Sequence, residues 1–143
     1  MPIRVLQVLG GLEAGGAETF VMNLYRKIDK SKVQFDFVKH ITHKGVFEDE
    51  IHQMGGKIYQ CPRYTGKNHF AYCKWWNNFF EEHSEYHVIH GHVRSTAAIY
   101  LKIAKKHGLV TIAHSHSTSN GNGIAAIIKD IMQLPIRCQA DYF

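Results

Sequence analysis

Hydrophobic and polar residues alternate along this chain with two different periods. Residues 3–9 form an apolar run that lacks the polar face of a helix, which is typical of a buried strand. Apolar residues then recur at helical spacing over 16–28, so one face of an amphipathic helix is predicted there. Alternating residues predict a second strand at 33–39, and a short helix at 46–54 is stopped by Gly55-Gly56.

The same succession of strands and helices continues to the end of the chain. We predict strands at 57–61, 86–90 and 109–114, and helices at 69–83 and 96–107. Pro62 ends the first of these strands and Gly108 ends the second of these helices, while Asn68 and Ser95 stand where a cap is expected. Beyond them follow a polar loop at 115–123, a helix from about 124 to near Pro135, and the opening of a sixth strand at 140–143.

This alternation predicts an α/β fold with a Rossmann-like parallel sheet and helices on both faces. The length of 143 residues corresponds to a single domain, 1–143, that is large enough to bury a sizeable core. In such sheets, ligands bind at the carboxyl ends of the strands. Three loops at those ends therefore carry the candidate chemistry, and they span 10–18, 90–95 and 114–123.

Composition narrows the class of protein. Apolar residues make up 45% and charged residues 20%, as in ordinary soluble proteins, and no apolar run is long enough to span a membrane. The first residues resemble a strand rather than a signal peptide. Cys61, Cys73 and Cys138 are far apart in the sequence, so we expect reduced thiols in a cytoplasmic protein. The net charge of +5 favours an anionic partner, although no nucleic-acid-binding motif is present and no nucleic acid is expected.

The loop at 10–18 reads G-G-L-E-A-G-G-A-E and holds more glycines than a turn requires. It does not contain G-x-G-x-x-G, and where the glycine spacing fits a P-loop the lysine is missing. Glycines just before a helix leave backbone N–H groups open to a ligand, and the helix dipole favours an anion there. The alternative is a flexible turn in which the glycines serve only to allow positive φ.

Two histidine pairs stand at the ends of the strands at 86–90 and 109–114: His90 with His92, and His114 with His116. They allow three interpretations: a zinc site, a substrate cleft in which imidazoles hydrogen-bond hydroxyls or move a proton, or polar strand ends in solvent. A third metal ligand of the Asp, Glu or Cys type is not evident nearby. Four residues beside these pairs favour the substrate cleft, because they add donors for phosphate and hydroxyl groups: Arg94, Ser115, Ser117 and Thr118.

The helix at 69–83 is rich in aromatic residues that cover more than one helical stripe: Phe70, Tyr72, Trp75, Trp76, Phe79 and Phe80. One interpretation is a core helix with a wide apolar face. The other is a partly exposed aromatic edge that, with Lys67 and Lys74, rests on a membrane interface or a lipid-linked substrate.

Four segments in order resemble the N-terminal domain of family 4 glycosyltransferases, which have the GT-B fold. They are G-G-A-E at 15–18, Y-H-V-I-H-G-H at 86–92, T-I-A-H-S-H-S at 111–117 and C-Q-A-D-Y-F at 138–143. The resemblance covers the whole chain, and it is nearest to the bacterial enzymes that assemble capsule, exopolysaccharide or lipopolysaccharide.

This resemblance implies two Rossmann-like domains that face each other across a cleft, with the acceptor on the N-terminal domain and the nucleotide-sugar on the C-terminal one. Transfer is typically retaining and needs no metal or other cofactor. The resemblance implies that Gly15 and Gly16 bind the donor diphosphate and that His114, beside the transferred sugar, is the catalytic residue. The residues implied on the acceptor side are His92, Arg94, His116 and Ser117.

The chain ends at Phe143, before its sixth strand is complete, and it contains no counterpart of the second domain. We therefore expect the N-terminal part of a longer transferase of polysaccharide biosynthesis, inactive alone because the groups that stabilise the leaving diphosphate are absent. A cytoplasmic location is expected, with peripheral contact to the inner face of the plasma membrane as a further expectation. Two alternatives remain: a stand-alone Rossmann-type nucleotide- or phosphate-binding module, and a metal-dependent hydrolase that uses the histidine pairs.

Overall fold

The computed structural model describes residues 2–12 and 15–114, apart from the side chains at 94 and 95. Its strands are β1 Ile3–Leu9, β2 Val33–Lys39, β3 Ile58–Gln60, β4 Val88–Gly91 and β5 Val110–Ala113. Its helices are α1 Gly16–Lys27, α2 Glu48–Gln53, α3 His69–Glu82 and α4 Arg94–Lys106. The strands and helices that the sequence predicts over this part of the chain are all present, with ends that differ by a few residues. The predicted loop at 115–123, the helix near Pro135 and the sixth strand lie outside the described residues.

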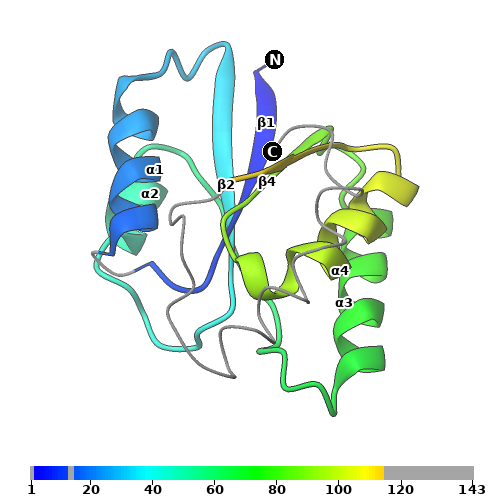
Figure 1. The fold of residues 1–143 in the computed structure, drawn as a ribbon. Coiled ribbons are helices and arrows are strands. Elements are labelled where there is room, and N and C mark those ends of the chain that lie inside the picture. Colours follow the sequence, from blue (N-terminus) through cyan, green and yellow to red (C-terminus); the bar gives the residue numbers. More distant parts are fainter. Residues whose placement is uncertain (1, 13–14, 115–143) are drawn as a thin grey trace.

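The five strands form one parallel sheet in the order β3-β2-β1-β4-β5. Helices α1 and α2 cover one face and α3 and α4 cover the other, which confirms the predicted Rossmann-like arrangement (Figure 1). The chain moves outward from β1 through β2 to β3 and then crosses back to place β4 on the other side of β1. This reversal puts a crevice between the loops that follow β1 and β4, where ligands of such folds bind.

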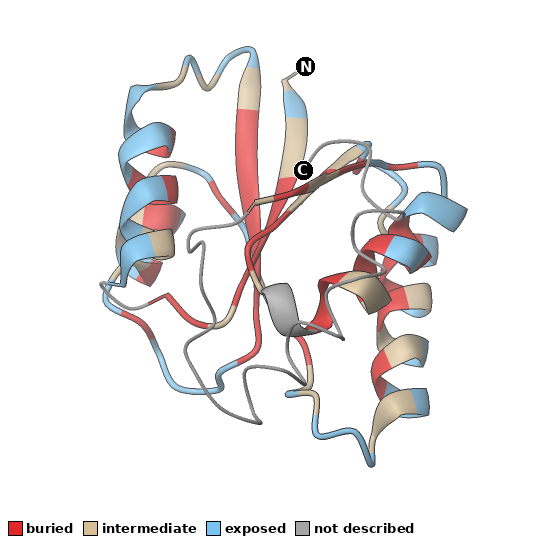
Figure 2. Cartoon of the chain, viewed as in Figure 1, coloured by how far each residue is buried: buried red, intermediate tan, exposed pale blue. Residues whose placement is uncertain are grey.

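Apolar side chains fill a separate layer on each face of the sheet, and the buried residues line the inner sides of the helices (Figure 2). Under α1 and α2 the core includes Val21, Met22 and Tyr25, which the helical spacing of the sequence brings to one face. Under α3 and α4 it is largely aromatic, with Tyr72, Trp76, Phe79 and Phe80 all buried. The interpretation of α3 as a core helix is thus confirmed for these four residues.

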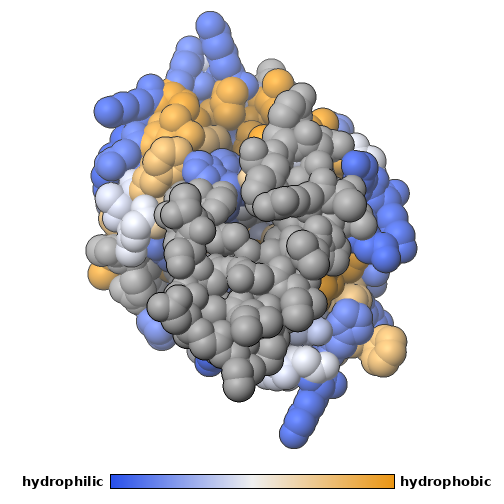
Figure 3. Space-filling view, in the orientation of Figure 1, coloured by the Kyte–Doolittle hydropathy of each residue, from blue (hydrophilic) through white to orange (hydrophobic). Residues whose placement is uncertain are grey.

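The outer surface has both hydrophilic and hydrophobic areas. In the space-filling view, hydrophilic residues dominate the outer rim and hydrophobic residues surface above the upper part of β1 and β2 (Figure 3). On α3 the side chain of Phe70 is 87% exposed, in contrast to the buried aromatic residues of the same helix. In the part of the chain that the structure describes, no helix is long and apolar enough to cross a membrane.

The ends of the helices follow the sequence prediction only in part. Gly55 and Gly108 follow α2 and α4 with φ of +89° and +86°, as expected for glycines that end helices. Asn68 stands at the cap position of α3, but its side chain bonds to Thr65 and to the carbonyl oxygen of Arg63 instead of capping the helix. The predicted cap position at Asn68 is confirmed, but no side-chain hydrogen bond of Asn68 caps the helix.

The predicted cap at Ser95 is also wrong, because α4 begins at Arg94 and the cap position is Val93. Tyr100 explains the earlier start, since its hydroxyl donates to the Val93 carbonyl oxygen at 3.0 Å and holds that residue against the helix. The predicted start of α2 at residue 46 is two residues too early. Glu48 begins this helix and forms a buried ion pair with Lys39, whose Nζ lies 2.7 Å from the carboxylate.

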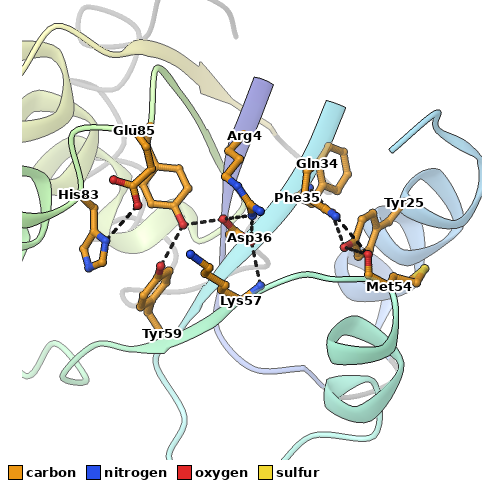
Figure 4. Close-up of polar contacts among 11 residues, drawn as sticks. Arg4, Tyr25, Gln34, Phe35, Asp36, Met54, Lys57, Tyr59, His83 and Glu85 are labelled. Atoms are coloured by element: carbon orange, nitrogen blue, oxygen red, sulfur yellow. Dashed lines mark hydrogen bonds and ion pairs between the residues drawn. The ribbon is translucent and has the colours of Figure 1, made fainter. Parts of the chain in front are cut away.

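A buried polar network, here called the Asp36 network, joins β1 and β2 to the residues just before β3 and β4 (Figure 4). Asp36 on β2 is fully buried, and Arg4 on β1 donates to both of its carboxylate oxygens, at 2.9 and 2.8 Å. The Tyr86 hydroxyl donates to the same carboxylate at 2.6 Å, and the backbone N–H of Lys57 donates at 2.8 Å. One carboxylate thus accepts hydrogen bonds from three other segments of the chain, so this network ties β1 and β2 to the segments that lead into β3 and β4.

Candidate functional site

Strands β4 and β5 bring the two histidine motifs together at the carboxyl edge of the sheet. The strands pair in parallel with Gly91 opposite Ala113, and the backbone N–H of His114 donates to the Gly91 carbonyl oxygen at 2.9 Å. On the other side, the N–H of His92 donates to the carbonyl oxygen of Val8 in β1 at 2.9 Å. The two histidine motifs therefore lie at the ends of neighbouring strands.

Three imidazoles form the resulting histidine cluster: His90, His92 and His114. Their ring centroids lie 4.1 to 5.4 Å apart, and Nε2 of His90 lies 3.1 Å from Nδ1 of His114, so one ring donates to the other. His92 is buried, and its Nε2 lies 2.8 Å from the side-chain oxygen of Gln7. His116 of the second pair lies outside the described residues.

Gln7 is a residue that the sequence analysis missed. It is almost fully buried in β1, where an uncharged polar side chain among apolar neighbours needs a hydrogen-bond partner. The signal was visible in the sequence, since Gln7 interrupts an apolar strand, but its partner is 85 residues away. The pair orients the His92 ring and sets its tautomer, because an amide oxygen only accepts hydrogen bonds and Nε2 must therefore carry the hydrogen.

The three imidazoles are also a candidate metal group, because one nitrogen from each lies within 4.8 Å of the others. Ideal tetrahedral zinc ligands at Zn–N distances near 2.0 Å stand roughly 3.3 Å apart, so the rings must draw inward to hold an ion. The sequence analysis looked for the third ligand among carboxylates and thiols. The structure corrects this, because the second histidine motif supplies it.

The glycine loop lies beside this cluster. Phe20 on α1 packs edge-on against His114 with 5.0 Å between ring centroids, so the first turns of α1 adjoin the histidine cluster. Gly15 occupies the cap position of α1, and no side chain among the described residues caps the helix. Its first backbone N–H groups are therefore available to an anion.

The backbone conformation of this loop does not require glycine. Gly10, Gly11, Gly15 and Gly16 all lack positive φ, so the alternative that they serve only to allow it is wrong. Gly15 and Gly16 are exposed, and a Cβ added at Gly16 would meet nothing within 4 Å. A Cβ added at Gly15 would collide with the Glu18 carboxylate, so of the two glycines only Gly16 provides an unobstructed backbone surface.

The glycine between His90 and His92 has a different role. A Cβ at Gly91 would collide with the hydroxyl of Tyr100, which belongs to α4 and is fully buried. The small residue therefore lets α4 pack directly on β4, and this contact carries His92 and the start of α4 to the rim.

A further histidine, His40, follows β2 at the same edge and was also missed. It is buried, its Nδ1 lies 3.0 Å from the carbonyl oxygen of Leu9, and its Nε2 lies 2.8 Å from the Tyr72 hydroxyl. Because a carbonyl can only accept, Nδ1 carries the proton and Tyr72 donates to Nε2. Burial lowers the pKa of His40, so the ring is neutral at pH 7. Its place directly after a strand, like that of His92 and His114, was the available signal.

The remaining predicted residues are placed as follows. Arg94 is the first residue of α4, next to the histidine cluster along the chain, and its side chain is outside the description, as is the whole of Ser117. Cys61 and Cys73 are free thiols, as expected, and burial raises the pKa of Cys61 to about 12. Cys61 therefore lacks the lowered pKa of a nucleophilic cysteine. Cys138 lies outside the described residues.

The comparison with protein families is decisive for the class of this chain. The model of Glycosyltransferase Family 4 matches residues 14–137, which is most of the sequence. The chain belongs to glycosyltransferase family 4. It is 38% identical over 132 residues, or 92% of its length, to EpsF of Bacillus subtilis (strain 168), which is named as a glycosyltransferase. The chain spans about a third of that relative, 34% of its length.

Among solved structures, the crystal structure of Acinetobacter baumannii MurG is similar in fold. The superposition includes 98% of this chain and 40% of the MurG chain. Its TM-score is 0.65, and the sequences are 12% identical. At that identity the likeness concerns the fold alone, and it confirms the α/β class expected from the sequence. Family membership and fold together confirm the resemblance that the four motifs carried.

Proposed function

We propose that this chain is the acceptor-side, N-terminal part of a glycosyltransferase that transfers a sugar from a nucleotide-sugar to a glycan or lipid-linked acceptor in polysaccharide biosynthesis. The observation that carries the proposal is the contact between Phe20 and His114. It joins an uncapped helix N-terminus, suited to a diphosphate, to a group of imidazoles suited to hydroxyls. A transferase needs these two kinds of site side by side.

In this proposal the backbone N–H groups at Gly15 and Gly16 bind the donor diphosphate. His114 lies beside the transferred sugar as the catalytic residue, and its hydrogen bond to His90 orients its ring. The acceptor is bound by His92, held in place by Gln7, together with Arg94, His116 and Ser117. Transfer is retaining and moves a hexose, and no metal ion takes part in it.

The proposal includes a second domain. Because the chain spans about a third of EpsF, the residues that complete the donor site belong to sequence beyond it. Alone, the 143-residue chain binds ligands weakly and transfers no sugar, since the leaving diphosphate lacks its remaining cations. We place the enzyme in the cytoplasm, with peripheral contact at the inner membrane face through the exposed end of α3 around Phe70.

Amide NMR of the chain tests the donor assignment. Addition of a uridine diphosphate sugar is expected to shift the backbone amide signals of Gly15 and Gly16, and Gly16→Asp is expected to abolish the shift by charge repulsion. Asn78→Asp, on the exposed surface of α3, adds the same charge and is the control. An absence of any shift at these two glycines, or sugar transfer by the chain alone, contradicts the proposal.

The second candidate function is a stand-alone nucleotide- or phosphate-binding module, which the uncapped start of α1 also favours. The same titration distinguishes the two. Selective binding of NAD at the glycine loop supports the module, whereas selective binding of nucleotide-sugars supports the transferase. The hydrolase alternative needs a metal at the histidine cluster, and zinc analysis of protein purified without chelators tests it.

A further inference from the structure

A second polar site lies on the same carboxyl edge, on the other side of β1 from His114. It is a pocket of about 360 Å³ formed by the ends of β1 and β2, the segment between β3 and α3, and the first turn of α4. The polar side chains that line it include those of His40, Arg63 and Thr96. A wider hollow of about 490 Å³ adjoins it and shares His40, Ile41 and Arg63.

Thr96 is the unusual residue of this pocket. Its side chain is only 4% exposed, and its hydroxyl has no hydrogen-bond partner among the described residues. The Tyr72 hydroxyl is near enough for Thr96 to affect its pKa, which burial raises, yet no hydrogen bond of normal geometry joins the two. A buried hydroxyl without a partner costs about 1–3 kcal/mol, so a polar ligand in the pocket would recover what folding loses.

The inner wall of the pocket is rigid and uncharged. His40 uses both ring nitrogens, one toward Leu9 and the other toward Tyr72, and burial lowers its pKa so that it stays neutral. The imidazole therefore has no proton to offer a ligand. Its contribution is to hold Tyr72, and with it the surroundings of the Thr96 hydroxyl, in one position.

Positive charge comes from Arg63 at the mouth. In the described part of the chain no ion pair includes Arg63, and none of the described residues that line the pocket or the adjoining hollow is acidic. The backbone of Arg63 is fixed, because Asn68 donates to its carbonyl oxygen at 2.8 Å while also accepting from Thr65. An exposed guanidinium on a fixed backbone beside a buried hydroxyl is a suitable arrangement for a carboxylate or phosphate.

We propose that this pocket binds an acidic group, a carboxylate or a phosphate, carried by the acceptor sugar, with Arg63 pairing the anion and Thr96 hydrogen-bonding the sugar or the anion. The inference rests on the proposed acceptor-side function and adds the class of acceptor to it. His92 and Val93 form the short segment from β4 to α4, and Val93 lines the pocket. In this proposal one acidic sugar is held in the pocket and presents a hydroxyl to the neighbouring His92.

Binding to the 143-residue chain tests this inference with four probes: glucuronate, glucose 6-phosphate, glucose and inorganic phosphate. Calorimetry and the amide NMR signals of Arg63 and Thr96 are the measurements. We expect one of the two acidic sugars to bind at least tenfold more tightly than glucose and than inorganic phosphate, and to shift these signals. The acidic sugar that binds identifies the anion as carboxylate or phosphate.

Two variants and a control examine the residues. Arg63→Gln and Thr96→Val are each expected to weaken binding of the acidic sugar about tenfold, and Thr96→Val folds at least as stably because it removes an unpaired hydroxyl. Lys67→Gln, which removes an exposed cation four residues from Arg63, leaves binding unchanged. Equal loss in Lys67→Gln would show a net-charge effect and overturn the assignment to Arg63.

Three further outcomes overturn the inference: equal binding of glucose and the acidic sugars, equal binding of inorganic phosphate, or no binding with unchanged signals at Arg63 and Thr96. The Gly16→Asp variant separates this inference from the proposed function, since it abolishes the response to nucleotide-sugar but leaves the acidic sugar bound. In the wild type, no response to the nucleotide-sugar together with intact binding of the acidic sugar refutes the proposed transferase alone. The reverse result refutes the acidic-acceptor pocket alone.

Discussion

The Asp36 network and the histidine cluster are both polar groups on the central strands of one sheet, yet they are built in opposite ways. In the Asp36 network, Arg4, Lys57 and Tyr86 supply only donors to one fully buried carboxylate. In the histidine cluster, each ring nitrogen can donate or accept, and two of the three rings, His90 and His114, are half-buried at the rim. Fixed roles and full burial make a structural joint, whereas exchangeable roles at the strand ends make a place for chemistry.

The largest effect that tests this contrast is expected at Asp36. Asp36→Asn replaces one acceptor oxygen by an amide that must face donors, so we expect a loss of about 3 kcal/mol in the free energy of unfolding. Urea denaturation measures it. Glu50→Gln is the control, because the Arg26–Glu50 pair is as short, at 2.7 Å, but exposed. Similar losses in the two variants would mean that burial is not what gives the Asp36 network its importance.

A second test compares two glycines at the carboxyl edge. Gly91→Ala forces a methyl group against the buried Tyr100 hydroxyl, and we expect a loss of about 2 kcal/mol by overpacking. Gly16→Ala meets open space at the start of α1 and is expected to keep or raise stability. Thermal and urea unfolding measure both. If Gly16→Ala destabilises as much as Gly91→Ala, Gly16 has a packing role and the open backbone surface proposed for the diphosphate is wrong.

His40 gives a smaller effect that depends on pH. Because burial lowers its pKa in the folded state, the unfolded chain binds more protons in the window between the lowered and the ordinary His value. The stability that neutral His40 provides is thus complete above about pH 6.5 and falls as the pH drops through the folded pKa. Tyr72, whose hydroxyl contacts the His40 ring, stays neutral across this range because burial raises its pKa.

The measurement is the free energy of unfolding at pH 7.5 and at pH 5.5 for the wild type and His40→Gln. The wild type is expected to lose more stability on acidification than the variant does. His52→Gln, at an exposed histidine of α2, is the control and should keep the wild-type dependence. Identical pH dependence in the wild type and His40→Gln contradicts the assignment of a buried neutral imidazole.

The sequence predicted the periodic part of the fold well, and for a physical reason. Each strand and helix exposes one face to a core, so the spacing of residues such as Val21, Met22 and Tyr25 encodes the helix directly. The caps were less predictable. Asn68 and Ser95 have the right chemistry for capping, but Asn68 bonds backward to its own loop and Tyr100 moves the start of α4 to Arg94.

The candidate site was predicted as two separate motifs and not as one cluster. Strand ends identified His90, His92 and His114, while parallel pairing of β4 with β5, which sequence order alone does not fix, makes them neighbours. Gln7 and Thr96 were missed because the sequence does not show their hydrogen bonds. The partner of Gln7 is His92, far along the chain, and the Thr96 hydroxyl has no partner among the described residues. A buried polar side chain has no distinctive spacing, so only three-dimensional structure shows whether its hydrogen bonds are complete.

The smallest effect on stability is expected at the histidine cluster itself. His114→Asn removes one hydrogen bond to His90 and a ring contact with Phe20 at a half-buried position, so the free energy of unfolding should fall by less than about 1 kcal/mol. A substitution in a structural joint, such as Asp36→Asn, is expected to lower the free energy of unfolding several times more. If His114→Asn costs as much as Asp36→Asn in the same urea series, the histidine cluster is a second structural joint. The contrast between the two polar groups then fails, and with it the catalytic role proposed for His114.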